Sequence, residues 1–428
     1  MTKRYYIIFI VTASMLNVQS FAQNQQLKYL LYSKQYPQLE LALSKPTTPE
    51  EDKFIYRAFL LNAYNKPQES DNLLRRIIKL KIKADDDTIQ FYLHRIAYDN
   101  KVKLNDYRAA FAASRHLLHG YSNFLDSTEL QDLIQESEIW RLLINTESQK
   151  ILAKEKAIIP IKHDLAGLWN IPVSIDDSIY DFVFDTGAGI STITETYAKK
   201  LKLDVIKNSS IVIRGGINGI ATNARLGVAK KFRIQELIIQ NAIFLIFPDS
   251  TLSFAGGSYK IKGIIGLPII KALGEIIIQK DKMTIPLNKD VLPVRHNMIL
   301  DLLKPVVYIS FNGESLPCTF DCGAQTSLFS DNFYNRFKED LKIDGKYDSL
   351  QIGGAGGDRT MKSVEMSVLN FSIANSPIQL VKAWVSLETM PVTRKYYYGN
   401  IGQDVINLFE TTTINFLSSS ISFTRHKD

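Results

Sequence analysis

The sequence carries two copies of one acidic motif, and this repetition restricts the possible folds more than any other feature. The first copy, Phe-Asp-Thr-Gly-Ala-Gly, occupies residues 184–189, and the second, Phe-Asp-Cys-Gly-Ala-Gln, occupies residues 320–325. A glycine that ends a second motif follows each aspartate at the same distance along the chain, in Ile-Ile-Gly at 264–266 and in Asn-Ile-Gly at 400–402. Because several positions agree at one spacing, we expect two homologous units.

Glycine pairs lie between the two motifs in both units. Gly215-Gly216 follows the first aspartate, and Gly353-Gly354 follows the second at nearly the same distance. From residue 158 onward, short runs rich in Ile, Val, Phe and Thr alternate with glycine-bearing turns, a pattern typical of β-strands. The sequence therefore predicts two mainly-β units, at residues 158–289 and 291–428.

Residues 23–150 show a helical pattern instead. Apolar side chains recur near the helical period, so that Leu74 and Ile78, for example, are expected to share one face. Short segments recur weakly at similar intervals, and Asn65 and Asn100 are one such pair. This repeat spacing is similar to that of stacked helix hairpins of the tetratricopeptide type. With 428 residues and about 150 per domain, we expect a multidomain α+β protein of about three domains.

Three shorter segments also have predicted structures. Residues 146–156 are polar and charged, which favours a linker. Residues 192–201 and 327–337, each just after an acidic motif, are expected to form short helices. Thr192 and Glu195 have the spacing of a capping box at the start of the first of these helices.

Residues 1–22 have the features of a secretory signal peptide. Lys3 and Arg4 precede an apolar stretch from Ile7 to Val18, and Ser20-Phe21-Ala22 supplies a small-x-small end. This apolar stretch is shorter than the roughly 20 residues that span a bilayer. We therefore expect an exported, periplasmic or secreted protein without a membrane span; a buried N-terminal helix is the alternative.

Two patterns suggest other functions, nucleic-acid binding and metal binding, but the surrounding sequence argues against both. The net charge is +7, and residues 75–83 are strongly basic, but apolar residues recur there at helical spacing and three aspartates follow, which favours a solvated helix face over nucleic-acid binding. His116 and His119 lie three apart on a predicted helix, but no third metal ligand is near them in sequence. We expect no nucleic-acid partner, no metal and no organic cofactor.

The acidic motifs are where a known family becomes visible. Asp185-Thr186-Gly187-Ala188, then a glycine pair, then Ile-Ile-Gly, resembles the pattern of retropepsin-like aspartic proteases. Two such units in one chain are similar to the bilobal pepsin-type arrangement, and the resemblance covers residues 158–428 but not the helical part. It implies that a pseudo-two-fold axis brings Asp185 and Asp321 together, so that a monomer suffices.

The resemblance implies a reaction and roles for the neighbouring residues. Two carboxyl groups in contact cannot both ionise, so the ionised one takes a proton from water while the protonated one polarises the peptide carbonyl. Gly187 and Gly323 would permit the tight turns that present the acids. Thr186 would hydrogen-bond across to the opposite loop, and Cys322 at the matching position, a weaker donor, would make that lock looser.

Ala188 and Ala324 stand where pepsin-like enzymes often have serine or threonine. A missing hydroxyl donor removes support for the charged carboxylate. We therefore expect a milder pH optimum than pepsin's, in the weakly acidic to neutral range.

The glycine-rich loops resemble flaps that close over an extended peptide. The residues concerned are Gly215, Gly216, Asn218 and Gly219 in the first unit, and Gly353 and Gly354 in the second. Their backbone would pair with substrate as an added strand, and closure would exclude water. A phosphate-binding loop is one alternative, but these loops lack the Gly-Lys-Ser/Thr ending that phosphate-binding loops have. An ordinary hairpin turn is the other alternative.

Together these features predict an exported aspartic endopeptidase that cleaves peptides or proteins with Asp185 and Asp321, with a possible protein partner for the helical domain. One alternative is a peptide-binding module without catalysis, which Cys322 and the polar Asn400 favour. Another alternative is that the helical domain is the functional centre.

A cysteine protease mechanism is disfavoured. A Cys322 nucleophile would need a histidine base, and even the histidine nearest in sequence, His296, is well separated from it along the chain.

Overall fold

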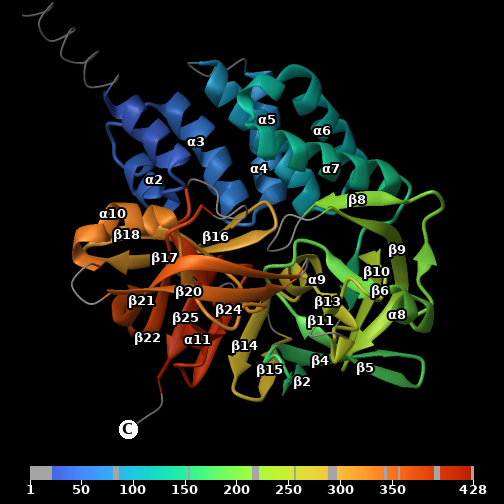
Figure 1. Ribbon diagram of the computed structural model, residues 1–428. Coiled ribbons are helices and arrows are strands. Elements are labelled where there is room, and N and C mark those ends of the chain that lie inside the picture. The colour runs from blue at the N-terminus through green and yellow to red at the C-terminus, as the bar shows by residue number, and fades with distance from the viewer. Residues whose placement is uncertain are drawn as a thin grey trace, which may run out of the picture.

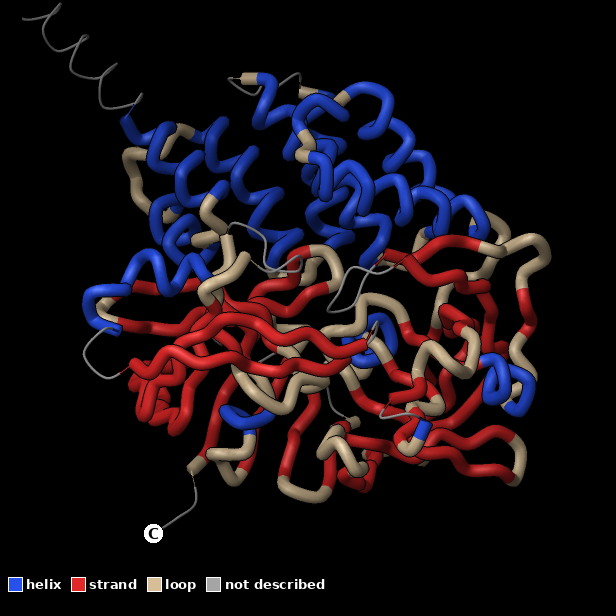
Figure 2. The backbone as a smooth tube through the Cα atoms, viewed as in Figure 1, coloured by secondary structure: helices blue, strands red, loops and turns tan. Residues whose placement is uncertain are grey.

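The structure is a computed structural model that describes residues 22–80, 86–152, 155–214, 221–254, 257–287, 296–341, 345–354, 357–389 and 396–425. Figures 1 and 2 show an N-terminal helical region followed by a largely β region, so the fold is α+β as predicted. Apart from residue 22, the predicted signal peptide lies outside the described residues. Among the described helices, none is long and apolar enough to cross a membrane.

The helical region is built from consecutive helices that pack against one another. Residues 22–32 are helical, followed by α2 (Tyr36–Leu43), α3 (Glu50–Ala63), α4 (Pro67–Lys79), α5 (Asp87–Lys103), α6 (Tyr107–Gly120), the 3-10 helix η1 (Ser122–Phe124) and α7 (Ser127–Leu143). Asp86, Asp106 and Asp126 cap the N-termini of α5, α6 and α7, where each carboxylate accepts hydrogen bonds from first-turn N–H groups.

Two details of the helical prediction are wrong. Ile78 is 74% exposed, whereas Leu74 is buried, because the buried stripe of α4 is narrower than the apolar pattern. Asn65 lies in the turn before α4 with a φ of 54°, but Asn100 lies inside α5, and the asparagine of the corresponding turn is Asn105 with a φ of 55°. Asparagine tolerates this left-handed conformation better than most residues, so the turn of Asn65 matches that of Asn105.

The first β unit is built around one large sheet with two short helices beside it. Its strands in chain order are β1 (Lys150–Leu152), β3 (Lys162–His163), β4 (Trp169–Ile175), β5 (Ser178–Phe184), β6 (Ser191–Thr194), β7 (Asp204–Val205), β8 (Ile211–Arg214), β9 (Ala221–Ile234), β10 (Leu237–Phe247) and β13 (Gly263–Ile265). The unit also contains the pair β11 (Ser253–Phe254) and β12 (Tyr259–Lys260), and helices α8 (Glu195–Lys200) and α9 (Leu267–Ala272).

The second β unit repeats the strand pairing of the first. Its elements are β16 (Met298–Asp301), β17 (Lys304–Phe311), β18 (Glu314–Phe320), β19 (Leu328–Phe329), α10 (Asp331–Leu341), β20 (Gly345–Gly354), β21 (Gly357–Ile373), β22 (Ser376–Ser386), β23 (Gly399–Ile401) and α11 (Gln403–Ile406). β13 lies parallel to β5 and antiparallel to β6; β23 lies parallel to β18 and antiparallel to β19. The duplicated sequence thus forms duplicated strand pairing.

A further sheet joins the two units. Its order is β2 (Ala157–Pro160), β15 (Lys282–Ile285), β14 (Glu275–Gln279), β24 (Thr411–Asn415) and β25 (Ser420–Thr424). Strand β14 of the first unit pairs with β24 of the second, so the last strands of the chain complete a sheet begun at the start of the first unit. One apolar core consequently runs through both units, from Ala157 to Ile421.

Local structure near the unit boundaries differs from the predictions. The expected linker contains β1, which pairs with β10, so part of it belongs to the first sheet. Thr192 lies in β6, and α8 begins only at Glu195 without a side-chain cap, so the predicted capping box is wrong. The β-branched residues of 191–194 instead fill a strand between β10 and β13. In the second unit, β19 likewise precedes α10.

The helical region lies over both β units (Figure 1). Ile299 and Val306 of the second unit share an apolar cluster with the first helices, while Leu226 and Val228 of the first unit share another with α7. These clusters bury apolar surface from both kinds of structure, so the helical region packs on the β units as one body with them.

Lys103, fully buried at the end of α5, joins the parts by polar contacts. Its Nζ donates to Leu300 O at 2.7 Å and pairs with Asp99 Oδ2 at 2.9 Å. Lys271 of α9 donates in turn to the carbonyl of Lys103 at 2.5 Å. One buried lysine thus connects the helical region with the second unit by its side chain and with the first by its backbone.

Replacing Lys103 with methionine should therefore destabilise the fold. The change would leave Asp99, 4% exposed, as an unpaired buried charge, and we expect the free energy of unfolding to fall by about 3 kcal/mol. Lys101→Met is the matched control on the same helix. Lys101 pairs with Asp71, which keeps Arg75 as a partner, so this change should cost about 1 kcal/mol or less. Urea unfolding that ranks the two variants equally would contradict the expectation.

Candidate active site

The two aspartates occupy equivalent places at the ends of paired strands. Asp185 directly follows β5 and Asp321 directly follows β18. The backbone N–H of Asp185 donates to Ile265 O at 3.1 Å, and that of Asp321 donates to Ile401 O at 2.9 Å. Each acid is thereby held beside the second motif of its own unit, which explains why the spacing between the motifs is the same in both.

The carboxyl groups face each other across the boundary between the units. A methyl group added at Gly187 would strike the carboxyl of Asp321, and one added at Gly323 would strike the carboxyl of Asp185. Any larger residue at either glycine would displace the opposite acid. Neither glycine has a positive φ, so the close approach of the opposite acid, and not the turn conformation, is what requires glycine at these positions.

Burial raises the pKa of Asp185 well above the usual value for an aspartate. The negative charge of Asp321 and the hydrogen bond between the two side chains raise this pKa further. The backbone N–H groups of Gly187 and Ala188 donate to Asp185 Oδ1 at 2.7 and 3.2 Å, which opposes the shift. The net effect favours a neutral Asp185 at pH values where an exposed aspartate is ionised.

The residues after the aspartates brace the two units against each other. The Thr186 hydroxyl donates to Phe320 O at 3.1 Å and accepts from the N–H of Cys322 at 2.9 Å. The Cys322 thiol donates to Phe184 O at 3.3 Å and accepts from the N–H of Thr186 at 3.3 Å. Both side chains are fully buried. The sulfur makes the same pair of contacts as the hydroxyl, at the longer distances and lower strength typical of a thiol.

A second pair of supports was not predicted from the sequence. Ser191 and Ser327, each six residues after its aspartate, accept hydrogen bonds from the N–H groups of Gly266 and Gly402 at 3.0 and 2.9 Å. Both serines are buried. Their identical spacing in the two units was visible in the sequence and could have identified them.

The second unit also places Asn400 at the acid pair. Asn400 Nδ2 donates to Asp321 Oδ2 at 3.5 Å, while Thr319 Oγ1 donates to Asn400 Oδ1 at 2.6 Å. The sequence showed Asn400 only as a departure from the first unit, where Ile264 holds this position.

The predicted glycine loops are only partly described. Gly215, Gly216, Asn218 and Gly219 lie outside the described residues, between β8 and β9 in the sequence. Gly353 and Gly354 end β20, an edge strand paired with β21. The described contacts therefore do not test the predicted flap roles.

The cysteines are free and fully buried. Burial raises the pKa of both thiols, and the charges of Asp185 and Asp321 raise that of Cys322 further. A nucleophilic cysteine needs a depressed pKa and access to substrate. Cys322 has neither, so its role is structural.

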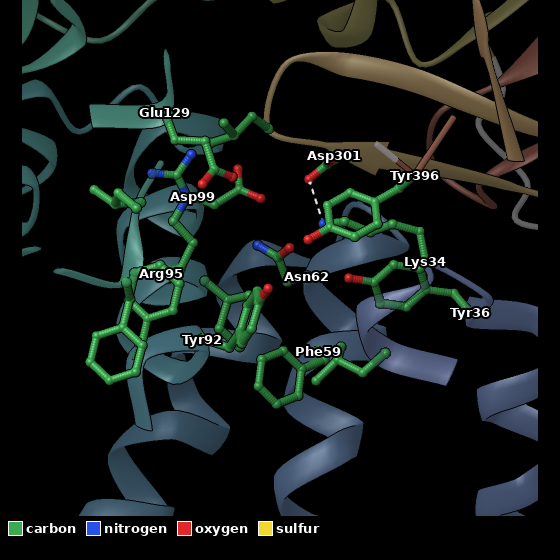
Figure 3. A pocket seen from close by; sticks show the side chains of 16 residues that line it. Lys34, Tyr36, Phe59, Asn62, Tyr92, Arg95, Asp99, Glu129, Asp301 and Tyr396 are labelled. Carbon is green, nitrogen blue, oxygen red and sulfur yellow. Dashed lines mark hydrogen bonds and ion pairs between the residues drawn. The ribbon is translucent and has the colours of Figure 1, made fainter. Parts of the chain in front are cut away.

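The described residues include no group of three or more metal-ligating side chains. A cavity of about 80 Å³ lies between the helices and the second β unit, with Arg95, Asp99 and Asp301 in its wall (Figure 3). Neither aspartate of the acid pair lines it. His116 packs near His94 at 4.6 Å between ring centres, an aromatic contact within the helical region.

Comparison with known families finds a match in the first β unit. A model of the aspartyl protease family matches residues 171–269, which include Asp185, Thr186 and Gly266. No curated protein matches the chain. The first β unit is therefore aspartic protease-like, and the match ends before Asp321.

Thr186→Val tests the brace. Valine keeps the shape but leaves the buried N–H of Cys322 without its acceptor, so we expect the free energy of unfolding to fall by about 2 kcal/mol. Thr192→Val is the control, because the buried Thr192 hydroxyl has no hydrogen-bond partner and its loss should change stability by less than about 0.5 kcal/mol. Equal effects of the two changes in chemical denaturation would argue against the brace.

Proposed function

We propose that the protein is an exported aspartic endopeptidase whose two β units are retropepsin-like lobes related by a pseudo-two-fold axis. The observation that carries the proposal is the meeting of Asp185 and Asp321 from equivalent strand ends, with the pKa of Asp185 raised by its burial and by its neighbour. The family match to residues 171–269 supports the same reaction class. No metal, cofactor or second chain is needed.

One bound water molecule is the nucleophile in this reaction. The ionised aspartate takes a proton from the water as its oxygen attacks the peptide carbonyl carbon, and the protonated aspartate gives its proton to the carbonyl oxygen. The resulting tetrahedral diol collapses as the amide nitrogen receives a proton from the acid that took one from water. As the C–N bond breaks, one hydroxyl of the diol returns its proton to the aspartate that protonated the carbonyl oxygen, so the products are a carboxylic acid and an amine and the pair is again singly protonated.

The substrate is a peptide or protein in extended conformation. The glycine loops, with Gly215, Gly216, Asn218 and Gly219 in one and Gly353 and Gly354 in the other, would pair with its backbone and limit access of bulk water. The helical region would act as a rigid support or bind a protein partner. The rival function, peptide binding without catalysis, draws support from the weaker Cys322 brace.

Asp185→Asn and Asp321→Asn should each lower kcat/KM for a cleaved library peptide by about 10³-fold, because an amide cannot exchange the required proton. Asp177→Asn, on an exposed turn of the same unit, should leave the rate within a factor of two. Peptide binding by wild-type protein without turnover between pH 3 and 8 would favour the rival function.

The pH profile follows from the direction of the Asp185 shift. Activity needs one protonated acid and one ionised acid, so it falls at both ends of the pH range. A raised pKa at Asp185 moves the alkaline fall toward neutral pH, because Asp185 keeps its proton until the pH passes that pKa. We expect a maximum in the weakly acidic to neutral range when kcat/KM is measured against pH. A maximum below about pH 3 would be inconsistent with this environment.

A further inference from the structure

The acid pair is asymmetric, because polar residues in the second unit replace apolar ones in the first. Asn400 and Thr319 correspond to Ile264 and Val183, which occupy the same paired positions in the first unit. Ile264 and Val183 are 8% and 2% exposed and pack in an apolar cluster. Asn400 and Thr319 instead form a hydrogen-bonded chain that ends at Asp321.

The direction of this chain is set by the single hydroxyl proton of Thr319, which goes to the nearer acceptor, Asn400 Oδ1 at 2.6 Å, and not to Gly399 O at 3.3 Å. The amide oxygen of Asn400 accepts the Thr319 hydroxyl at 2.6 Å, so the amide NH₂ group is the end that points to Asp321 Oδ2. The Thr319 hydroxyl also lies 3.3 Å from Gly399 O, which keeps it within the same strand pair. An NH₂ group can only donate, so it favours the charged form of the carboxyl group it faces.

The two acids consequently receive different sets of donors. Both oxygens of Asp321 face N–H groups, since Gly323 N donates to Oδ1 at 2.8 Å and Asn400 donates to Oδ2. On Asp185, the N–H donors of Gly187 and Ala188 both reach Oδ1. Among the hydrogen bonds of the described residues, no N–H donor reaches Asp185 Oδ2, which leaves that oxygen able to carry a proton.

We propose that Asn400, oriented by Thr319, is a positioning residue that keeps Asp321 ionised as the base, so that Asp185 carries the proton as the acid. This assignment rests on the proposed peptidase function. In the reaction, Asp321 then removes the proton from water and Asp185 gives its proton to the substrate carbonyl oxygen. The charge of Asp321 raises the pKa values of two neighbouring groups among the described residues, Asp185 and the buried Cys322 thiol, so both stay neutral beside an ionised Asp321.

The test copies the first unit into the second. In Thr319→Val/Asn400→Ile, Asp321 loses its Oδ2 donor, so the acidic limb of kcat/KM against pH should move upward by about one pH unit. Thr319→Val alone should move it less, because the amide remains but is no longer held. Thr412→Val is the matched control, since the buried Thr412 hydroxyl has no hydrogen-bond partner and lies in the joining sheet; its profile should match wild type.

A measurement that needs no turnover separates this proposal from the function itself. In protein with ¹³C-labelled aspartate carboxyls, the signal lost in Asp321→Asn should titrate at lower pH than the signal lost in Asp185→Asn. Thr319→Val/Asn400→Ile should bring the two closer. The proposal is overturned if the order is reversed, or if both the acidic limb and the Asp321 signal stay within about 0.2 pH units of wild type. Absence of peptide cleavage by the wild type would reject the peptidase, and the carboxyl titration would still decide the assignment.

Discussion

Two acids held in contact inside a protein cannot both be ionised, and the rest of this structure is arranged around that constraint. Asp185 and Asp321 reach each other only because each follows a central strand and because Gly187 and Gly323 leave room for the opposite carboxyl. Burying this pair costs free energy, so contacts elsewhere must hold the two units together. The Thr186–Cys322 hydrogen bonds, the continuous apolar core and the shared β14–β24 pairing provide such contacts, since all three join one unit to the other.

The helical region adds a further brace beside that core. Its apolar side chains enter clusters with both β units, and the buried Lys103 contacts helix, second unit and α9 together. Asp301 of β16 pairs with Lys34 and accepts a hydrogen bond from Tyr397, three residues before Asn400. The helical region is therefore connected to the segment that leads into β23, the strand that carries Asn400. A protein with these contacts should hold its two acids in one geometry rather than gain it on binding substrate.

The sequence predicted the features that depend on repetition and on local period. The duplicated motif implied equivalent strand ends for Asp185 and Asp321, and the change from helical to strand pattern located the two kinds of structure. Features set by tertiary pairing were missed. Strand β1 forms in a polar segment because β10 offers an edge, and Thr192 extends as a strand because β10 and β13 flank it. In the sequence, Asn400 appeared only as a departure from the motif. Its contact with Asp321 depends on the parallel register of β23 with β18, which the sequence does not reveal.

Neutron diffraction from deuterium-exchanged crystals near neutral pH measures the shared proton directly. We expect the nearest oxygens of Asp185 and Asp321 to lie about 3 Å apart, with a single deuteron between them on the Asp185 side. Carboxyl groups more than about 6 Å apart, each ionised within its own solvent shell, would contradict the shared-proton pair and remove the chemical basis for peptide hydrolysis here.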